Sequence, residues 1–335
     1  MHSDPTIASA VWYEARGVAA LRTEALPPLA AGHARVRTLF SGISRGTERL
    51  VCSGRVPASE WTRMRAPLQV GDFPFPVKYG YSAVGVVEEG PPALLGRTVF
   101  CLHPHQDRFD APLAMLIPVP ADVPARRATL AANMETALNA VWDSGAGPAD
   151  RIAVIGAGVV GLLVAALASR LPGAEVTVCD IDPSRAAIAR ALGARFADPS
   201  AAPADCDVVF HASASEAGLA TALACAGVEA SVVELSWYGD RPVSVPLGGA
   251  FHASRLRLVA SQVGMVSTSR RPRWPHARRL AAALALLADE RLDALTRGTL
   301  DLADAPGVLP RVLGQGALGL APVIRYAGAE ETGSA

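Results

Sequence analysis

The sequence has few cysteines, the residues whose disulfides stabilise small extracellular domains. Its five cysteines form no CxxC pair and no even framework, which argues against a disulfide scaffold and favours a reducing compartment. Charged residues make up only 19% of the chain and hydrophobic residues 50%, a balance typical of a globular protein rather than a disordered or fibrous one.

Targeting and membrane signals are also missing. The longest apolar stretch, IAVIGAGVVGLLVAALA, is shorter than the roughly 20 residues of a membrane span and is interrupted by glycines. The N-terminal residues lack the basic segment and apolar core of a signal peptide. Basic and acidic residues balance at 31 each, which argues against general polyanion binding. We therefore expect a cytoplasmic protein that binds neither membranes nor nucleic acids.

The pattern of apolar residues changes near position 135. The 335 residues suffice for two domains, and up to about residue 130 short strand-like runs alternate with Pro and Gly. Beyond it, a helix ending at Gly145 is followed by alternating strands and helices, one of them with Asp182 as N-cap and Pro183 at its first position. Such alternation predicts an α/β fold with a doubly wound parallel sheet.

The strongest chemical signal is the glycine-rich segment after the strand RIAVIG. Gly156 permits a tight turn, Gly158 allows a pyrophosphate to approach the backbone, and Gly161 allows close packing of helix and strand. The helix then begins at Val159 and Val160, whose backbone N–H groups and helix dipole favour an anion. This order of strand, loop and helix predicts a dinucleotide-binding (Rossmann) domain.

Asp180 indicates which nicotinamide cofactor is used. It ends the next strand, 19 residues after Gly161, where a carboxylate can accept hydrogen bonds from both adenosine ribose hydroxyls. The same charge repels the 2′-phosphate of NADP, which calls for an arginine nearby. Arg185, the nearest arginine, falls inside the following helix. NAD is therefore the predicted cofactor, and NADP is disfavoured.

These features together resemble the medium-chain dehydrogenase/reductase family along essentially the whole chain. The matching segments are SGISRGTE (41–48), GYSAVGVVEEG (80–90), GRTVFCLHP (96–104), the glycine loop and LRLVASQVG (256–264). The resemblance implies a GroES-like, β-rich catalytic domain from residues 1–134 and 263–335 and a Rossmann NAD-binding domain at 135–262. It also implies a homodimer formed edge to edge through the Rossmann sheets, with a strand expected around Pro242 to Pro246.

The zinc ligands of the family's alcohol dehydrogenases have no counterpart here. By motif alignment they would fall at Ser44, at Tyr81 and near Ala132 or Asn133, none of which is a usual zinc ligand. The family's four-cysteine structural lobe is also missing. We therefore expect a zinc-free member, although Glu48 and Glu135 lie nearby and leave an improvised metal site open. SGISRGTE is most similar to the branch that contains bacteriochlorophyllide dehydrogenase.

Without zinc, side chains must donate hydrogen bonds to the substrate oxygen and move its proton. Tyr81, in the vacated ligand position, is one candidate, and a hydroxyl that satisfies only a local backbone group is the alternative. His103 falls where the family places a substrate-pocket side chain and is the second candidate. The His105 side chain points to the same side as that of His103 if residues 103–105 stay extended. For both histidines the alternative is a solvent-facing loop.

The loop after Ser44 holds further candidates. Thr47 and Glu48 occupy the positions of the family's proton-relay groups, and Glu48 is alternatively a carboxylate that caps the helix starting there. Arg45 is expected to reach the cofactor phosphates, with an exposed arginine as the simpler reading. Thr136 completes the set of predicted cofactor contacts.

A basic run, SRRPRWPHARR (269–279), has two readings. It would attract a carboxylate- or phosphate-bearing substrate, or it is a solvated helix start, which we favour.

These observations predict a zinc-independent oxidoreductase that transfers a hydride between NAD(H) and an alcohol or ketone bound in the cleft between the domains. Two alternatives stay open: an NADPH-dependent quinone or enoyl reductase, and a non-catalytic nucleotide-binding protein.

Overall fold

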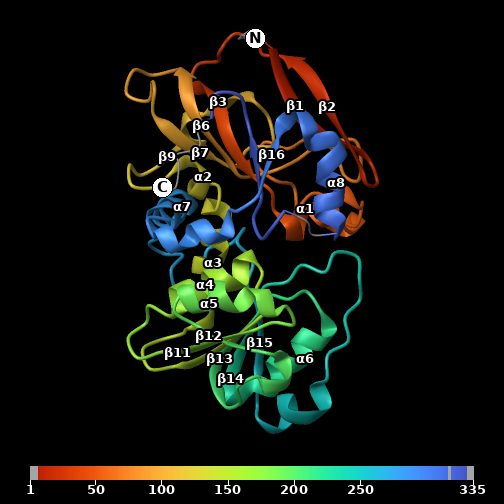
Figure 1. Ribbon diagram of the computed structural model, residues 1–335, viewed down its shortest axis with the longest axis vertical. Helices are drawn as coiled ribbons and strands as arrows, with labels where there is room; N and C mark the ends of the chain where they lie inside the picture. The colour runs from red at the N-terminus through yellow and green to blue at the C-terminus, as the bar shows by residue number, and fades with distance from the viewer. Residues whose placement is uncertain (1–6, 316–317, 330–335) are drawn as a thin grey trace. The chain divides into compact units, whose positions relative to one another are not determined.

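A computed structural model describes residues 7–315 and 318–329 (Figure 1). The chain divides into two compact units, one made of residues up to Ala132 together with those from Leu280 onward, the other of Asn133–Arg279. The second unit thus runs further along the chain than the expected 135–262. Buried Arg279 explains this extent, because it donates hydrogen bonds to Glu135 and Asn139 within the same unit. No helix in the described ranges has both the length and the hydropathy needed to cross a bilayer.

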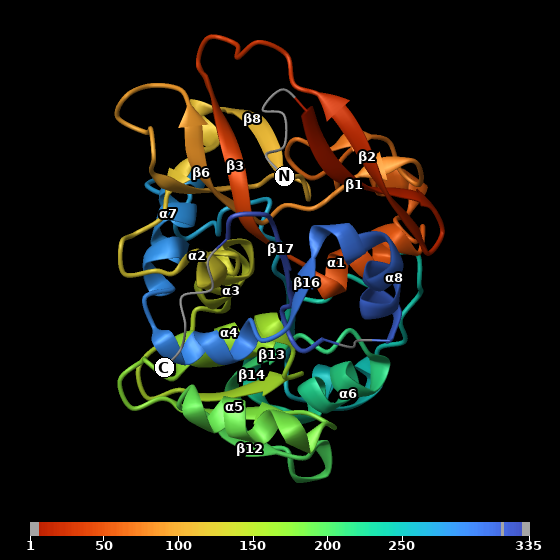
Figure 2. The ribbon, with the colours of Figure 1, turned by 45° about the horizontal axis from the view of Figure 1, so that its top comes forward.

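The first unit is built mainly from two sheets, as the short Pro- and Gly-bounded runs predict. One sheet has the order β2-β1-β5-β4, and the other has the order β16-β17-β3-β6-β7-β9, with β8 also paired to β3. Figure 2 shows β1 beside β2 and β3 beside β6. Neighbouring strands are antiparallel except β16 and β17. The strands are β1 (Ile7–Ala15), β2 (Val18–Ala25), β3 (His33–Gly42), β4 (Val70–Gly71), β5 (Val77–Lys78), β6 (Ala83–Glu89), β7 (Thr98–Cys101), β8 (Arg108–Pro112), β9 (Ile117–Pro118), β16 (Thr299–Asp301) and β17 (Val323–Arg325).

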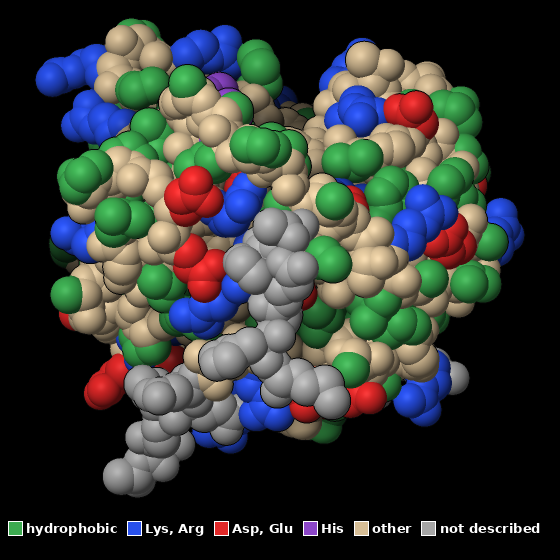
Figure 3. Space-filling view, turned by 90° about the horizontal axis from the view of Figure 1, so that it is seen from above, with side chains coloured by type: hydrophobic (Ala, Val, Ile, Leu, Met, Phe, Trp, Pro, Cys, Tyr) green, Lys and Arg blue, Asp and Glu red, His purple; other side chains and the backbone are tan. Residues whose placement is uncertain are grey.

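Short helices connect and follow the strands of the first unit. They are α1 (Arg45–Cys52), α2 (Ala125–Ala128), α8 (Ala305–Gln315) and the 3-10 helices η1 (Ala58–Glu60), η2 (Leu113–Met115), η6 (Glu290–Leu295) and η7 (Leu302–Asp304). Alternate apolar residues of β3, β6, β7 and β8 form the core of the larger sheet, since successive side chains of a strand point to opposite faces. On the face shown in Figure 3, basic and acidic side chains are interspersed among apolar ones.

The second unit contains a parallel sheet of six strands with the order β12-β11-β10-β13-β14-β15. Its elements are β10 (Arg151–Ile155), α4 (Val159–Ala168), β11 (Glu175–Cys179), η3 (Pro183–Arg185), α5 (Ala186–Ala191), β12 (Arg195–Ala197), η4 (Pro199–Ala201), β13 (Cys206–His211), α6 (Glu216–Cys225), β14 (Ala226–Glu234), the π-helix η5 (Leu247–Phe251) and β15 (Arg257–Ala260). Helices α3 (Ala131–Ser144) and α7 (His276–Leu286) contain the points where the chain passes from one unit to the other.

The α/β class with a β-rich GroES-like unit and a doubly wound Rossmann sheet is thereby confirmed. The strand order reverses between β10 and β13, and at such a switch point ligands bind beyond the carboxyl ends of the strands. The strand expected around Pro242 to Pro246 is not there. Two prolines without N–H groups cannot complete a strand ladder, and β15 is the edge strand instead.

Candidate active site

The glycine loop between β10 and α4 is shaped by close contacts within the second unit. Gly156 has φ +108° and lies so near the segment after β13 that a Cβ there would be 2.8 Å from the Ser213 backbone nitrogen. A Cβ on Gly161 would come within 2.0 Å of the Gly156 carbonyl oxygen. Both positions therefore require glycine, for the turn and for the approach of α4 to the loop.

Gly158 is different, because a Cβ there would meet nothing within 4 Å. Packing inside the chain therefore does not require this glycine, whereas a phosphate approaching the backbone would. Gly158 is also the N-cap residue of α4 and has no side chain to cap it. The N–H groups of Val159 and Val160 begin the helix, where the first turn has no intrahelical acceptors. This end of the second unit has the features of an anion-binding site.

Asp180 is anchored to the glycine loop. Its carboxylate accepts hydrogen bonds from the backbone N–H of Ala157 at 2.6 Å and of Asp182 at 2.8 Å. The side chain is thus held beside the loop, with acceptor capacity left for a ribose. Arg185 pairs with Asp182 at 3.1 Å, so its guanidinium is engaged within η3.

Tyr81 lies in the first unit, between β5 and β6, and contacts the start of α1. Its hydroxyl donates to Ser44 Oγ and also hydrogen-bonds Thr47, so three of the positions singled out in the sequence meet here. Burial raises the pKa of Tyr81 to about 12, although the bonds to Ser44 and Thr47 act in the opposite direction. The phenol is therefore neutral near pH 7 and able to donate its proton.

Glu48 is the centre of a fully buried hydrogen-bond network. It accepts from the backbone N–H of Ser44, the N-cap residue of α1, at 2.7 Å and from Tyr13 at 2.9 Å. His105 Nε2 lies 3.0 Å from the same carboxylate, and His105 Nδ1 lies 2.7 Å from Ser41 Oγ. With every neighbour already bonded, Glu48 has the geometry of a structural carboxylate that also binds the helix start.

His103 is buried and stacks on Phe109, with ring centroids 3.8 Å apart. Burial lowers its pKa to about 3, and the Nδ1 contact with the Pro104 carbonyl oxygen at 2.9 Å only partly opposes this. The ring is therefore neutral at physiological pH. Neither His103 nor His105 faces solvent, and no hydrogen bond joins His103 to Tyr81 among the described residues.

The remaining predicted residues have simpler surroundings. Arg45 donates to the Gly319 carbonyl oxygen at 2.7 Å in the first unit. Thr136 is half-buried in α3. Within the basic run, Arg278 lies over Trp274, whereas Arg279 is fully buried against Glu135. The run is thus partly a structural element rather than a wholly solvated helix start.

The side chains present do not suit a catalytic zinc ion. Ser44 and Tyr81 hydrogen-bond to each other, and Glu48 already has acceptor contacts on both oxygens. Across residues 7–315 and 318–329, no group of three His, Cys, Asp or Glu side chains is arranged to hold a metal. Zinc sites require such a set.

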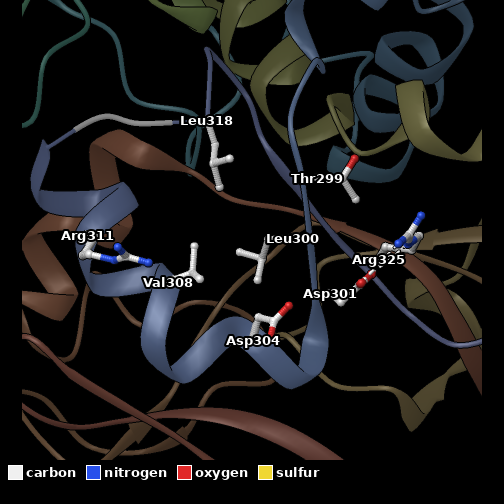
Figure 4. Close-up of a pocket in the computed structure, with 8 residues that line it drawn as sticks. All are labelled: Thr299, Leu300, Asp301, Asp304, Val308, Arg311, Leu318 and Arg325. Carbon is white, nitrogen blue, oxygen red and sulfur yellow. Dashed lines mark hydrogen bonds and ion pairs between the residues drawn. The ribbon is translucent and has the colours of Figure 1, made fainter.

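A cavity of about 340 Å³ in the first unit contains none of the predicted site residues (Figure 4). Asp301 and Arg325 form a bidentate ion pair on one side, and Val308 and Arg311 of α8 face it from the other. Its lining residues are Thr299, Leu300, Asp301, Asp304, Val308, Arg311, Leu318 and Arg325.

Sequence reasoning missed a polar chain at the carboxyl end of β13 and β14. His211 is fully buried, with Nδ1 2.7 Å from Glu234 and Nε2 2.7 Å from Ser213 Oγ. Parallel pairing places His211 directly opposite Glu234. The sequence signal for this pair was that two successive apolar strands each end in a titratable residue, His211 and Glu234.

Comparison with known proteins agrees with this architecture. The family model described as "Alanine dehydrogenase/PNT, C-terminal domain" matches residues 131–232. A protein described as a zinc-binding dehydrogenase from Sinorhizobium meliloti 1021, bound to NADP, superposes with a TM-score of 0.76 at 19% identity, covering 95% of this chain and 99% of that one. L-idonate 5-dehydrogenase of Escherichia coli K-12 gives 0.77 at 14% identity, covering 96% and 98%.

A third solved structure bears on the cofactor. A short chain alcohol dehydrogenase of Escherichia coli CFT073, in complex with NADH, has a TM-score of 0.75 at 15% identity, covering 96% of this chain and 100% of that one. The chain therefore has the two-domain fold of these dehydrogenases. Since one of them holds NADP and another NADH, the fold alone does not distinguish the two cofactors.

Proposed function

We propose that this chain is an oxidoreductase that uses NAD(H) to interconvert an alcohol and a ketone without zinc. The observation that carries the proposal is the glycine loop with its anchored carboxylate. Packing within the chain requires glycine at 156 and 161, whereas a Cβ on Gly158 would meet no atom within 4 Å. The Ala157 N–H holds the Asp180 carboxylate beside this loop. That combination fits a pyrophosphate with an adenosine ribose next to it.

NAD rather than NADP is supported by the charges around Asp180. A 2′-phosphate would lie against this carboxylate, which costs free energy by like-charge repulsion. Arg185, the nearest candidate to compensate for it, is paired with Asp182. In this assignment Gly158, Val159 and Val160 contact the pyrophosphate, Asp180 the ribose, and Arg45 and Thr136 complete the cofactor contacts.

Tyr81 is the proposed proton donor to the substrate oxygen. The bound nicotinamide would supply or accept the hydride at its C4. Tyr81 holds a proton at its hydroxyl across the physiological pH range because burial raises its pKa to about 12. Ser44 and Thr47 orient that hydroxyl. Glu48 holds the start of α1 in place, and neutral His103 offers a hydrogen bond rather than a titrating proton.

Zinc independence is supported by the donor set itself. The positions that would carry zinc ligands are engaged in hydrogen bonds with one another, and hydroxyls such as those of Ser44 and Tyr81 are not usual zinc ligands. We further propose that residues 1–134 and 263–335 act as the catalytic domain and residues 135–262 as the NAD-binding domain, although 263–279 pack with the second compact unit. We also propose a relation to the bacteriochlorophyllide dehydrogenase branch, a cytoplasmic location and a homodimer. Exposed Leu258 on the edge strand β15 supports the homodimer.

Replacing Tyr81 with Phe tests the reaction. A panel of alcohols with NAD, and of ketones with NADH, should give turnover in the wild type, repeated after dialysis against a chelator. Tyr81→Phe should lower kcat by roughly 10²- to 10⁴-fold, the usual contribution of a general acid. Tyr79→Phe is the matched control, since Tyr79 packs edge-on against Tyr81 and should keep wild-type activity.

Four results would contradict the proposal. Full activity of Tyr81→Phe would remove the assigned proton donor, while loss of activity on chelation would remove zinc independence. Turnover only of activated double bonds with NADPH would favour a quinone or enoyl reductase. Nucleotide binding without any turnover would leave a non-catalytic binding protein.

A further inference from the structure

The basic run SRRPRWPHARR (269–279) lies in a part of the chain that carries no negative charge. Between residues 241 and 288 there is no Asp or Glu, whereas eight arginines occur there. The whole chain has 31 acidic and 31 basic residues, so this separation of charge is local. A local excess of one sign creates a potential that attracts the opposite sign.

Four arginines of the run have no counter-charge within the chain. Arg270, Arg271, Arg273 and Arg278 are exposed, and none of them pairs with a carboxylate in the part of the chain that the structure describes. Arg279 is different, because it is fully buried and pairs with Glu135 at 3.0 Å. We call the four exposed residues the arginine patch. Four like charges within nine residues repel one another, and a bound anion would relieve that repulsion.

Two tryptophans of the second unit support the arginine patch. The rings of Trp142, in α3, and Trp274 have centroids 4.9 Å apart. The Arg278 guanidinium lies 4.0 Å from the Trp274 centroid, and the Arg270 guanidinium lies 5.6 Å from the Trp142 centroid. Such cation–π contacts hold a guanidinium without neutralising its charge. The N–H donors at its edge keep the fork geometry that binds a carboxylate through two hydrogen bonds.

The backbone of the arginine patch is tied to the same unit. The N–H groups of Arg270 and Arg271 bond to the Ser267 carbonyl oxygen, at 2.9 and 2.8 Å. The Ser267 N–H in turn bonds to Asn139 Oδ1 at 3.0 Å. Arg271 Nε and Arg278 Nη1 donate to backbone carbonyl oxygens at 3.2 and 2.9 Å, which leaves their other N–H donors for a ligand. The patch is therefore a fixed array of guanidiniums rather than a flexible basic tail.

The position of Arg278 is unfavourable for the helix that contains it. Helix α7 begins at His276, so Arg278 lies in its first turn, which has no acidic residue. The start of a helix carries partial positive charge and is stabilised by acidic side chains rather than basic ones. A charge that opposes the local rule is expected where a surface has a function.

An extended acidic peptide fits the arginine patch better than a small anion or a nucleic acid does. The four side chains are spread over nine residues, and an extended peptide, which advances about 3.3 Å per residue, presents a row of carboxylates to them. Proteins that bind single-stranded nucleic acids without sequence preference stack the bases on open aromatic faces. Here guanidiniums lie over both Trp142 and Trp274.

We propose that the arginine patch binds an acidic segment of a partner protein, whose Asp or Glu carboxylates accept hydrogen bonds from Arg270, Arg273 and Arg278. The proposal does not depend on the NAD(H) reaction, because none of the residues assigned to the cofactor or the substrate belongs to the patch. Charge complementarity at an exposed surface contributes to specificity and association rate more than to affinity. The interaction should therefore be weak and sensitive to salt.

Fluorescence anisotropy with a labelled peptide of eight glutamates and the full-length chain tests the proposal. Arg270→Gln/Arg273→Gln should weaken binding of this peptide by about 3- to 10-fold at about 50 mM NaCl, as expected for the loss of two exposed charge pairs. Raising the NaCl concentration to about 200 mM should weaken binding to the wild type more than binding to this variant.

Arg151→Gln/Arg195→Gln is the matched control. It removes the same number of charges from exposed arginines of the same unit, which pair with Asp205 and Glu175 at 3.3 and 3.0 Å. Its affinity for the acidic peptide should equal that of the wild type. A labelled peptide of eight glutamines should not bind the wild type.

Equal peptide affinities of the two double variants would overturn the proposal, because the effect would then not belong to the arginine patch. No detectable binding of the acidic peptide to the wild type at about 50 mM NaCl would also overturn it. Binding of the glutamine peptide as tight as that of the glutamate peptide would exclude charge as the determinant. Tighter binding of a single-stranded oligonucleotide of eight thymidines would overturn the choice of an acidic protein segment and indicate a nucleic acid instead.

Discussion

Each unit contains a hydrogen-bonded chain of the same chemistry, and the two differ in where they end. In the first unit Tyr326, Ser41 and His105 lead to Glu48, with contacts of 2.7, 2.7 and 3.0 Å. In the second unit two serines and His211 lead to Glu234. The first chain is enclosed at both ends, since Glu48 is 0% exposed and Tyr326 only 3%. The second ends at half-buried serines at the carboxyl edge of the parallel sheet.

This difference separates an enclosed network from one that is open at one end. A buried carboxylate and a histidine do not by themselves mark a site, because in the first unit the same pair is enclosed by the fold and Glu48 is bonded to Tyr13, the Ser44 N–H and His105. In the second unit the network ends at the half-buried Ser213 and Ser215, and the Ser213 backbone borders Gly156 of the glycine loop. Accessibility at the end of the chain, rather than its chemistry, distinguishes the two.

The two networks should differ most in what they contribute to folding stability. Glu48→Ala removes the acceptor of His105, Tyr13 and the Ser44 N–H, and should lower the free energy of unfolding by about 3–5 kcal/mol in a urea titration. Glu234→Ala should cost less, about 1–3 kcal/mol, because the Glu234 side chain is 15% exposed and water can enter the space that it leaves. Glu14→Gln, at a partly exposed ion pair with Arg22, serves as the control and should not move the midpoint.

A Glu48→Ala protein as stable as Glu234→Ala, or more stable, would contradict this expected difference between the two networks. It would mean that the enclosed network contributes no more to the fold than the one at the sheet edge.

A smaller effect on stability is expected from His103, which has no carboxylate partner among the described residues, whereas His105 contacts Glu48 and His211 contacts Glu234. Its folded pKa of about 3 lies below the unfolded value near 6.5, so between these pH values only the unfolded chain takes up a proton. The stability from His103 is therefore complete above about pH 6.5 and is lost as pH falls, by about 1.4 kcal/mol per pH unit. Urea titrations from pH 7 to 4.5 should show this slope in the wild type and a shallower one in His103→Gln. Identical slopes would contradict the assignment.

The parts of the molecule that depend on local sequence were predictable. The glycine loop, Asp180, the Asp182 cap and the helix that ends before Gly145 follow from residues close together in the chain, and each is seen in the structure. The alternation of apolar strands and helices was enough for the parallel sheet.

The parts that depend on long-range pairing were not predictable. Tyr13, Glu48 and His105 meet from three separate segments, and no local pattern indicates that they share one network. The sequence suggested that His103 titrates near neutral pH. Its burial against Phe109 could not be foreseen, because that contact depends on how β7 and β8 pack into one core cluster. His211 and Glu234 became a pair only through the register of β13 and β14.

Titration of the purified protein with NADH and NADPH, at one ionic strength, tests the central claim most directly. The fixed carboxylate of Asp180 predicts that NADH binds about tenfold or more tightly than NADPH, and that Asp180→Asn narrows the difference. NADPH binding as tightly as NADH, or no binding of either nucleotide, would contradict the account.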